Sequence, residues 1–350
     1  MNIKKLLLAV MAWVGWLATA SPVFAQNWII TGAPSTNWTA IASSVDGAKL
    51  VAADGTDGQI YASTNFGTNW TLSVNMPGMY WNAVASSTNG NNLVAATGSG
   101  EIYVSTNSGE AWSPSMAAPG AYWTALAISA DGTNIVAVSG GAVPSIYTST
   151  NLGTTWFSNN VPGESWYSVA SSADGKRLVA ASNTDPLTDN GPGTIYTSTN
   201  SGLTWNTNNL ARQYWSGVAS SADGIKLVGA AQGSGWFYFS TNGGAIWTSN
   251  YVAAGFWTSV ASSADGTRLL AVANSGVIYT SGDSGAAWQQ NNAPDAPYQA
   301  AATSWDGNRS VALVPSGRIY SSHSGPASSG HGPRPDSLCS KTPTSPRPPG

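Results

Sequence analysis

The sequence predicts an all-β fold, a single seven-bladed β-propeller made of four-stranded blades. Two observations carry this prediction. A unit of about 42 residues recurs seven times, and a fixed period of roughly 20 to 50 residues is typical of solenoids, propellers and arrays. Each unit also contains four short runs of β-type residues separated by turn residues, without helical periodicity. The units begin at one aromatic position, occupied by Trp38, Trp81, Trp123, Trp166, Trp215, Trp257 and Tyr298.

The copy that begins at Trp257 shows the four runs of a unit. Its first run ends at Asp265 and Gly266, and such a pair favours a tight hairpin turn because both positions tolerate positive φ. A second run rich in Leu and Val follows, then a third with Tyr279 and a fourth that starts at Trp288. One such sheet cannot bury both of its faces, whereas seven sheets arranged radially pack face against face. We therefore expect the repeated tryptophans to pack between blades.

The last unit is incomplete, and the N-terminal segment matches its missing part. After Ile319–Ser322 the chain reaches Pro326 without the second tryptophan of the unit. Trp28 precedes Trp38 by 10 residues, just as the second tryptophan Trp247 precedes the next leading tryptophan, Trp257. Because an unpaired sheet edge is a liability, we expect Trp28–Thr31 to form the outer strand of the seventh blade and close the ring.

A second motif joins the third and fourth runs of six units. The first copy has Ser63, Asn65, Gly67 and Trp70; Gly permits the turn, and Asn can fold its side chain back onto backbone donors. The motif resembles the Asp-box or BNR repeat, Ser-x-Asp-x-Gly-x-x-Trp, of propellers in sialidases, other glycoside hydrolases, sortilin-type receptors and the photosystem II assembly factor. Five copies carry Asn in place of Asp. The resemblance implies structural loops away from the ligand-binding face, with structural roles for Asn65, Trp70, Asn107, Trp112, Asn151, Trp156, Asn200, Trp205, Asn242, Trp247, Asp283 and Trp288.

Composition narrows the class of protein. Charged residues make up 8% of the chain and the formal net charge is -3, which argues against a basic nucleic-acid-binding surface. The single cysteine, Cys339, allows no intrachain disulfide. A basic start and an apolar run too short to span a bilayer predict a signal peptide over residues 1–25, cleaved near Ala25, with no membrane span afterwards. We expect the propeller to cover residues 26–325 and a disordered Pro-, Ser- and Gly-rich tail to cover 326–350.

Patterns expected of an enzyme are not found. A sialidase needs three arginines that converge on the substrate and a tyrosine activated by a glutamate, and we find no such Tyr–Glu pair in the sequence. Arg177, Arg268 and Arg309 follow equivalent turns of different units, so we expect them to spread around the ring. Asp185 and Asp189 lie in the one sizeable insertion, where a surface loop is favoured over a cation site. We expect no catalytic residue, no metal and no cofactor.

The connections between units offer the best candidate for a binding surface, because they should line one end of the central channel. An aromatic residue recurs just before the first run of several units. Exposed aromatic side chains can stack on sugars or hold a peptide, and the alternative is that they pack beneath their own loops. The candidate ligand-binding residues are Tyr80, Tyr122, Glu164, Arg212, Tyr214 and Phe256.

These observations favour a monomeric, non-catalytic propeller, secreted or periplasmic, that recognises or scaffolds a glycan or a protein through this surface. One alternative is a sialidase-like or other glycoside hydrolase. Another is a chaperone resembling the photosystem II assembly factor. The resemblance to that factor implies a basic patch, which this chain of low charge lacks.

Overall fold

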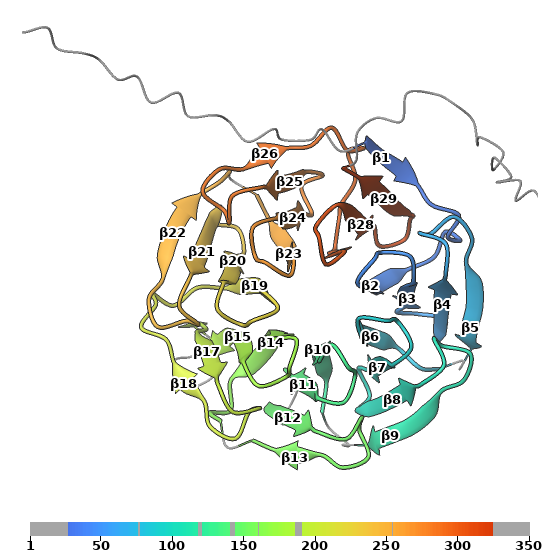
Figure 1. Cartoon of the computed structure of the whole chain (residues 1–350), viewed down its shortest axis with the longest axis horizontal. Coiled ribbons are helices and arrows are strands. Elements are labelled where there is room, and N and C mark those ends of the chain that lie inside the picture. The colour runs from blue at the N-terminus through green and yellow to red at the C-terminus, as the bar shows by residue number, and fades with distance from the viewer. Residues whose placement is uncertain are drawn as a thin grey trace, which may run out of the picture.

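Seven antiparallel sheets form a ring in the computed structural model of the chain (Figure 1). The structure describes residues 27–75, 78–117, 121–140, 144–159, 161–185, 191–253 and 255–324. The all-β, seven-bladed fold predicted from the sequence is confirmed. The predicted signal peptide and the predicted tail, with Cys339, lie outside the described residues. Within the described ranges, no helix is both long and apolar enough to cross a membrane.

The strands of each blade follow one another from the centre of the ring outward (Figure 1). Blade I holds β2 (Trp38–Ser43), β3 (Leu50–Asp54), β4 (Gln59–Ser63) and β5 (Thr71–Asn75), and blade II holds β6 (Trp81–Ser86), β7 (Leu93–Thr97), β8 (Glu101–Ser105) and β9 (Ser113–Ala117). Blade III holds β10 (Trp123–Ile128), β11 (Ile135–Ser139), β12 (Ser145–Ser149) and β13 (Phe157–Ser158). Blade IV holds β14 (Ser165–Ser171), β15 (Leu178–Asp185), β16 (Gly191–Pro192), β17 (Ile195–Ser198) and β18 (Asn206–Thr207).

The remaining three blades follow the same order along the chain, with one exception at the end. Blade V holds β19 (Trp215–Ser220), β20 (Leu227–Ala231), β21 (Trp236–Ser240) and β22 (Thr248–Tyr251), and blade VI holds β23 (Trp257–Ser262), β24 (Leu269–Ala273), β25 (Ile278–Ser281) and β26 (Gln289–Gln290). Blade VII holds β27 (Ala300–Thr303), β28 (Arg309–Leu313) and β29 (Ile319–His323), and the N-terminal strand β1 (Asn27–Ile30) completes it.

The second strand of a blade is buried on both faces. In β3, Leu50 and Ala52 pack in one cluster with residues of blade VII, whereas Val51 and Ala53 pack with Trp81 of blade II. Successive side chains of a strand point to opposite sides of the sheet, so each side of β3 meets a different neighbouring blade. This explains why the second run of most units is continuously apolar and does not alternate with polar residues.

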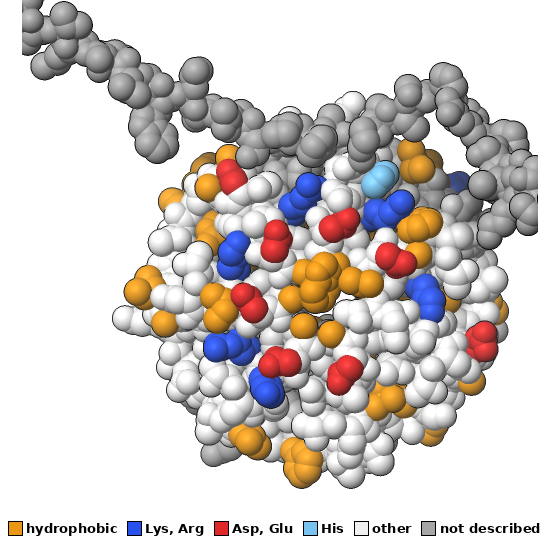
Figure 2. Space-filling view, in the orientation of Figure 1, with side chains coloured by type: hydrophobic (Ala, Val, Ile, Leu, Met, Phe, Trp, Pro, Cys, Tyr) orange, Lys and Arg blue, Asp and Glu red, His pale blue; other side chains and the backbone are white. Residues whose placement is uncertain are grey.

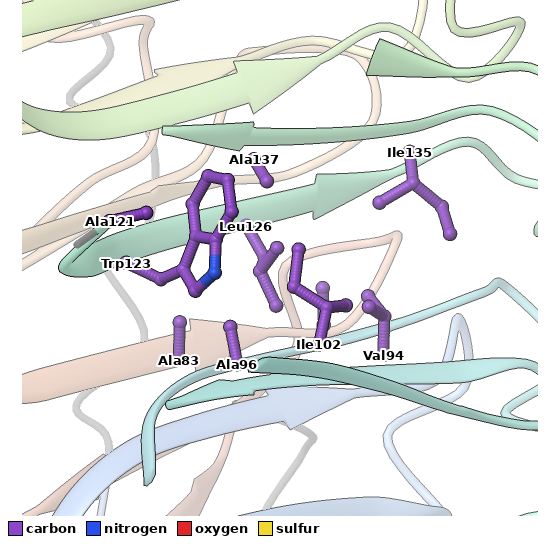
Figure 3. Close-up of a cluster of buried hydrophobic side chains, with 10 residues drawn as sticks. Ala83, Val94, Ala96, Ile102, Ala121, Trp123, Leu126, Ile135 and Ala137 are labelled. Carbon is purple, nitrogen blue, oxygen red and sulfur yellow. The ribbon is translucent and has the colours of Figure 1, made fainter. Parts of the chain in front are cut away.

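The leading aromatic residue of each unit packs between blades, as predicted. Figure 3 shows Trp123 lying between the sheets of blades II and III, close to Ala83 and Ala96 of blade II. Trp123 also meets Tyr147 of its own blade edge to face, with 5.6 Å between ring centroids and 80° between ring planes. The equivalent pair in blade VII joins two tyrosines at 5.9 Å. Such pairs add about 0.5–1.5 kcal/mol each beyond the area they bury.

The N-terminal strand closes the ring at blade VII. Strand β1 pairs antiparallel with β29 (Figure 1). In this pairing Trp28 lies opposite Ser322. The N–H of Thr31 continues the pairing by donating to the carbonyl of Ile319 at 2.9 Å. The side chain of Trp28 is buried in a cluster shared with blade VI. The closure inferred from the incomplete seventh unit is therefore what the structure contains.

The loops with the repeated Ser, Asn, Gly and Trp have the turn geometry expected from their residues. In the first copy, Asn65 Oδ1 accepts hydrogen bonds from Ser63 Oγ at 3.1 Å and from the N–H of Asn69 at 2.8 Å. Gly67 has a φ of 79°, and its carbonyl accepts a bond from Trp70 Nε1 at 3.0 Å. The aspartate of the sixth copy accepts the same two bonds as Asn65. Asparagine therefore supports this turn as aspartate does.

The inner turns, which join the first and second strands of each blade, differ from the prediction in one respect. In the described turns only the Gly of the Asp-Gly or Asn-Gly pair has positive φ, as in Gly47 at 75°. The aspartate instead acts as a hydrogen-bond acceptor within the turn. Asp46 Oδ1 accepts from Ser44 Oγ at 2.7 Å and from the N–H of Ala48 at 2.9 Å. The Ser44 hydroxyl, followed by the Ala48 amide, holds the pKa of Asp46 below its usual value.

A closed circle of backbone hydrogen bonds joins the inner turns of all seven blades. The N–H of Val45 donates to the carbonyl of Thr88 in the next blade at 2.8 Å, and each following blade repeats this bond. The circle ends where the N–H of Trp305 donates to the carbonyl of Val45 at 2.8 Å. We call this circle the collar, and its members are Val45, Thr88, Ala130, Ala173, Ala222, Ala264 and Trp305. It links blade VII to blade I independently of strand β1.

Candidate functional site

The two ends of the ring carry different classes of loop. One end, the turn face, carries the inner turns and the loops with the repeated Ser, Asn, Gly and Trp. The other end, the connection face, carries the inter-blade connections and the loops between second and third strands. Because consecutive strands of a blade are antiparallel, these loop classes alternate between the two ends. The candidate ligand-binding residues belong to the connection face.

Four of the six candidates are aromatic, and the structure leaves about half of each ring exposed. Tyr80, Tyr122, Tyr214 and Phe256 have exposed fractions of 54%, 51%, 45% and 63%. Each directly precedes the buried aromatic residue of a first strand. These rings are therefore not packed fully beneath their own loops, which was the alternative to a binding surface.

The backbone holds these aromatic residues in fixed positions. The carbonyl of Tyr80 accepts a hydrogen bond from the N–H of Gly98 at 2.9 Å, and the carbonyl of Tyr122 accepts one from Gly140 at 3.0 Å. The ring of Tyr122 lies against Gly98 of the preceding blade, where an added Cβ would come within 2.9 Å of its Cε2 atom. Each ring thus starts from an ordered backbone, which lowers the entropy lost when it contacts a ligand.

Three further exposed aromatic residues of this face were missed in the sequence. Tyr167 is 45% exposed, and partial burial, followed by the proximity of Tyr122, raises its pKa. Trp236 and Tyr251 meet edge to face with 5.6 Å between ring centroids. Tyr251 lies against the same glycine-rich turn of blade V as Phe256. The exposed aromatic surface is therefore larger than the sequence suggested.

The position of Tyr167 in its unit is a signal that could have revealed it. Thr39, Thr124 and Thr258 hold this position in three other blades. Each donates its hydroxyl hydrogen to the carbonyl of the next blade's leading aromatic residue, at 2.7 to 2.9 Å. A tyrosine is too long to make that short bond, so its side chain extends toward the surface.

Glu164 differs from the other candidates because it is buried, with 2% of its surface exposed. Its carboxylate accepts hydrogen bonds from the hydroxyls of Ser182 and Tyr196, the latter at 2.7 Å. The expectation that no glutamate pairs with a tyrosine is therefore wrong. Because Tyr196 is buried as well, the pair supports the connection that precedes β14 and does not reach the surface. The partners lie 18 and 32 residues from Glu164, so no local pattern reveals them.

Arg212 is exposed on the connection between blades IV and V. Its Nη1 atom lies 3.4 Å from the carbonyl oxygen of Pro192, to which it donates. Pro192 belongs to β16, which pairs with the end of β15. Blade IV is therefore a five-stranded sheet, unlike the four strands predicted for every blade. Asp189 and the other residues of 186–190 lie outside the described part of the chain.

The arginines that follow the inner turns do not converge, as predicted. Arg177 lies across Gly224 of the next blade, where an added Cβ would come within 2.5 Å of the arginine side chain. Arg268 Nη1 donates to Asn308 Oδ1 of the next blade at 2.5 Å. The guanidinium of Arg309 lies over an aromatic ring of blade I, 3.9 Å from its centre. Each arginine therefore fastens a different pair of blades and none of the three is placed to share a carboxylate with another.

Asp54 and Glu101 are two carboxylates outside the inner turns that accept local hydrogen bonds. Asp54 is buried and accepts bonds from Thr36, from Thr56 and from the N–H of Asp57. Burial is the largest single influence and opposes ionisation, but the hydrogen bonds together lower the pKa of Asp54. Among the residues that the structure describes, no three His, Cys, Asp or Glu side chains gather into a group that could hold a metal ion.

Comparison with known proteins identifies the fold. The chain matches no protein-family model and no curated protein sequence. Among solved structures it is similar to YCF48 bound to D1 peptide, with a TM-score of 0.65 at 15% identity, covering 85% of this chain and 96% of that one. It is also similar to YCF48 from Cyanidioschyzon merolae, with a TM-score of 0.62 at 15% identity, covering 85% and 98%. At this identity the likeness establishes a shared propeller fold.

Proposed function

We propose that this protein is a non-catalytic propeller that binds a segment of another protein across its connection face. The observation that carries the proposal is the set of half-exposed aromatic rings on an ordered backbone. Tyrosine and tryptophan are enriched among the residues that contribute most to protein interfaces, because a rigid ring buries a large area. The set consists of Tyr80, Tyr122, Tyr167, Tyr214, Trp236, Tyr251 and Phe256.

The comparison of folds supports a protein ligand over a glycan on this face. One of the similar structures is YCF48 bound to D1 peptide, so a propeller of this shape is suited to hold a peptide. Of the alternatives left open by the sequence, a chaperone-like binder of a protein segment is therefore favoured. The low charge of this chain indicates recognition through aromatic contacts with apolar side chains, without a basic patch.

Two observations weigh against a sialidase-like hydrolase. The one Tyr–Glu pair found, Tyr196 with Glu164, is buried, whereas a nucleophile must reach its substrate. Arg177, Arg268 and Arg309 each contact a different neighbouring blade on the turn face. Export by a signal peptide and a monomeric state complete the proposal and rest on the sequence.

The test is the binding of the purified protein to an array of immobilised random peptides. The variant Tyr122→Ala/Phe256→Ala removes two rings of the connection face. Truncating an aromatic residue at the centre of an interface costs about 2 kcal/mol or more, which is roughly a thirtyfold loss of affinity. Phe157→Ala is the matched control, because Phe157 is 60% exposed but lies on the outer strand β13.

We expect the wild type and Phe157→Ala to select the same peptides and Tyr122→Ala/Phe256→Ala to lose them. Equal binding by all three proteins would rule out the connection face as the site. A fluorogenic sialoside assay addresses the hydrolase alternative separately. Turnover by the wild type that Glu164→Gln abolishes would replace the present proposal with an enzymatic one.

A further inference from the structure

Trp305 breaks the sequence repeat at the centre of the turn face. The other six collar positions hold Val, Thr or Ala. The side chain of Trp305 is 45% exposed, although two collar bonds fix its backbone. Within the described residues, Trp305 and Trp236 are the two tryptophans outside the repeated positions. Packing between blades, which explains the repeated tryptophans, does not explain Trp305.

Trp305 borders an open cavity of about 170 Å³, which the inner turns line at the centre of the ring. On the face shown in Figure 2, hydrophobic side chains gather at the centre and charged side chains surround them. For scale, an engineered protein cavity of roughly 150 Å³ binds benzene. The cavity beside Trp305 therefore has room for one six-membered ring.

Serine hydroxyls line the cavity in a repeating arrangement. The last residue of the first strand is a serine in five blades, and each donates its proton to the carbonyl of the next residue at 2.9 to 3.0 Å. The oxygen of each hydroxyl then keeps lone pairs that can accept a hydrogen bond. These lining residues are Ser43, Ser86, Ser171, Ser220 and Ser262. A ligand that fits this wall must bring several hydrogen-bond donors.

The charges around the cavity balance. In the stretch from each inner turn to the start of the second strand, six acidic and six basic residues occur. The described ring of charge therefore favours neither an anion nor a cation, and a neutral ligand fits it best. The acidic residues are Asp46, Asp131, Asp174, Asp223, Asp265 and Asp306, and the basic residues are Lys49, Lys176, Arg177, Lys226, Arg268 and Arg309.

We propose that this cavity binds a neutral saccharide, with one pyranose ring stacked on the indole of Trp305. A pyranose combines an apolar C–H face, which the electron-rich face of an indole attracts, with hydroxyls that can donate to the serine oxygens. The ligand is either a free monosaccharide or the terminal sugar of a glycan. Because this site lies at the opposite end of the ring from the connection face, it stands independently of the proposed peptide binding.

The test is an NMR titration of the ¹⁵N-labelled full chain with glucose, galactose, mannose and N-acetylglucosamine, together with a glycan array. We expect at least one sugar to shift an indole N–H signal that is missing in Trp305→Phe. Trp305→Ala should lower the affinity for that sugar at least about tenfold, as loss of a central aromatic contact does. Trp305→Phe should still bind, because it keeps an aromatic face. Selective binding on the array would identify a glycan terminus, and binding of monosaccharides alone would identify a free sugar.

Phe157→Ala is the matched control, because Phe157 is an exposed aromatic residue (60%) that lies on the outer strand β13, outside both proposed binding surfaces. Trp305→Gln keeps much of the side-chain length without an aromatic ring and separates stacking from an effect on folding, which thermal unfolding of each variant monitors. The proposal is overturned if no saccharide binds in the millimolar range. It is equally overturned if a folded Trp305→Gln binds sugar as the wild type does, or if Phe157→Ala weakens binding as much as Trp305→Ala.

Discussion

The turn face and the connection face of this propeller differ in how regularly their residues and hydrogen bonds repeat from blade to blade. On the turn face, the inner turns repeat nearly the same residues and bonds in every blade, and the collar links them in a circle. On the connection face, the segments differ in length and residues, and rings such as Tyr122 and Phe256 remain half exposed. The residues that repeat from blade to blade are therefore the ones whose hydrogen bonds hold the ring together. The surfaces that we propose for binding are instead marked by exposed aromatic side chains, among which Trp305 on the turn face departs from the repeat.

The largest expected effect comes from opening the ring, which both faces depend on. Deleting residues 26–33 removes strand β1 and the buried side chain of Trp28. Loss of a buried tryptophan alone costs about 3–5 kcal/mol, so the melting temperature should fall sharply. A chain shortened by residues 326–350 is the control, and we expect it to melt like the wild type. Similar melting of all three proteins would show that the collar closes the ring without β1.

Replacing a glycine by alanine should lower the free energy of unfolding more on the turn face than on the connection face, although less than opening the ring does. Gly224 in an inner turn has a φ of 70°, and an added Cβ would come within 2.5 Å of Arg177. Gly163, on the connection face, has nothing within 4 Å of that position. Denaturant unfolding should show that Gly224→Ala loses about 1–3 kcal/mol, because an unfavourable backbone conformation has this cost. Gly163→Ala should stay within about 0.5 kcal/mol of the wild type.

Equal losses in Gly224→Ala and Gly163→Ala would contradict the division between the faces. The result would then mean that the connections are as constrained as the inner turns. A loss in Gly224→Ala alone would sharpen the comparison by locating the constraint in the turn.

Acid should weaken the turn face through its aspartates. Hydrogen bonds to the carboxylates of Asp46, Asp131, Asp174 and Asp223 lower their pKa values. Because the folded-state pKa is lowered, the stabilisation is present above the unfolded value of about 3.9 and is lost as the pH falls below it. Melting temperatures measured from neutral pH downward should therefore drop below about pH 4.

The variant Asp174→Asn tests this effect in one turn. Asparagine already holds the equivalent position at Asn89, where its Oδ1 accepts the same bonds from Ser87 and Asn91. We expect little change at neutral pH and a shallower decline in acid, the smallest effect of the series. An acid decline identical to that of the wild type would mean that carboxylates elsewhere, such as Asp54, cause it.

The fold could be predicted almost completely from the sequence because every blade carries the same pattern of aromatic, turn and apolar residues. The leading aromatic residues and the asparagine turns lie where the repeat predicts them. Trp28, which takes the place of the second tryptophan of the seventh unit, does so as well. The seventh blade was predictable for the same reason, since its missing strand matched residues at the other end of the chain. One unit alone would predict its strands and turns poorly, whereas seven copies of the same pattern predict them together.

The candidate site could be predicted only in part, because only some of its residues occupy a recurring position of the repeat. Tyr80, Tyr122, Tyr214 and Phe256 share one position and could be found, and the structure shows them half exposed. Glu164 shared their neighbourhood in the sequence, yet it is buried by Ser182 and Tyr196, which only the folded chain brings near. Trp305 lies in an inner turn, and nothing in the sequence indicates that it borders a cavity. Only the folded chain shows its place in the collar and beside that cavity.

The central claim is that the connection face recognises a protein segment without contributing to the stability of the ring. The most direct test measures peptide-array binding and the free energy of unfolding of the same preparation of Tyr122→Ala/Phe256→Ala. We predict peptide binding reduced by about thirtyfold or more, with each of the two substitutions changing the free energy of unfolding by no more than about 0.5 kcal/mol. Unchanged binding, or a loss of stability that accounts for the loss of binding, would contradict the account.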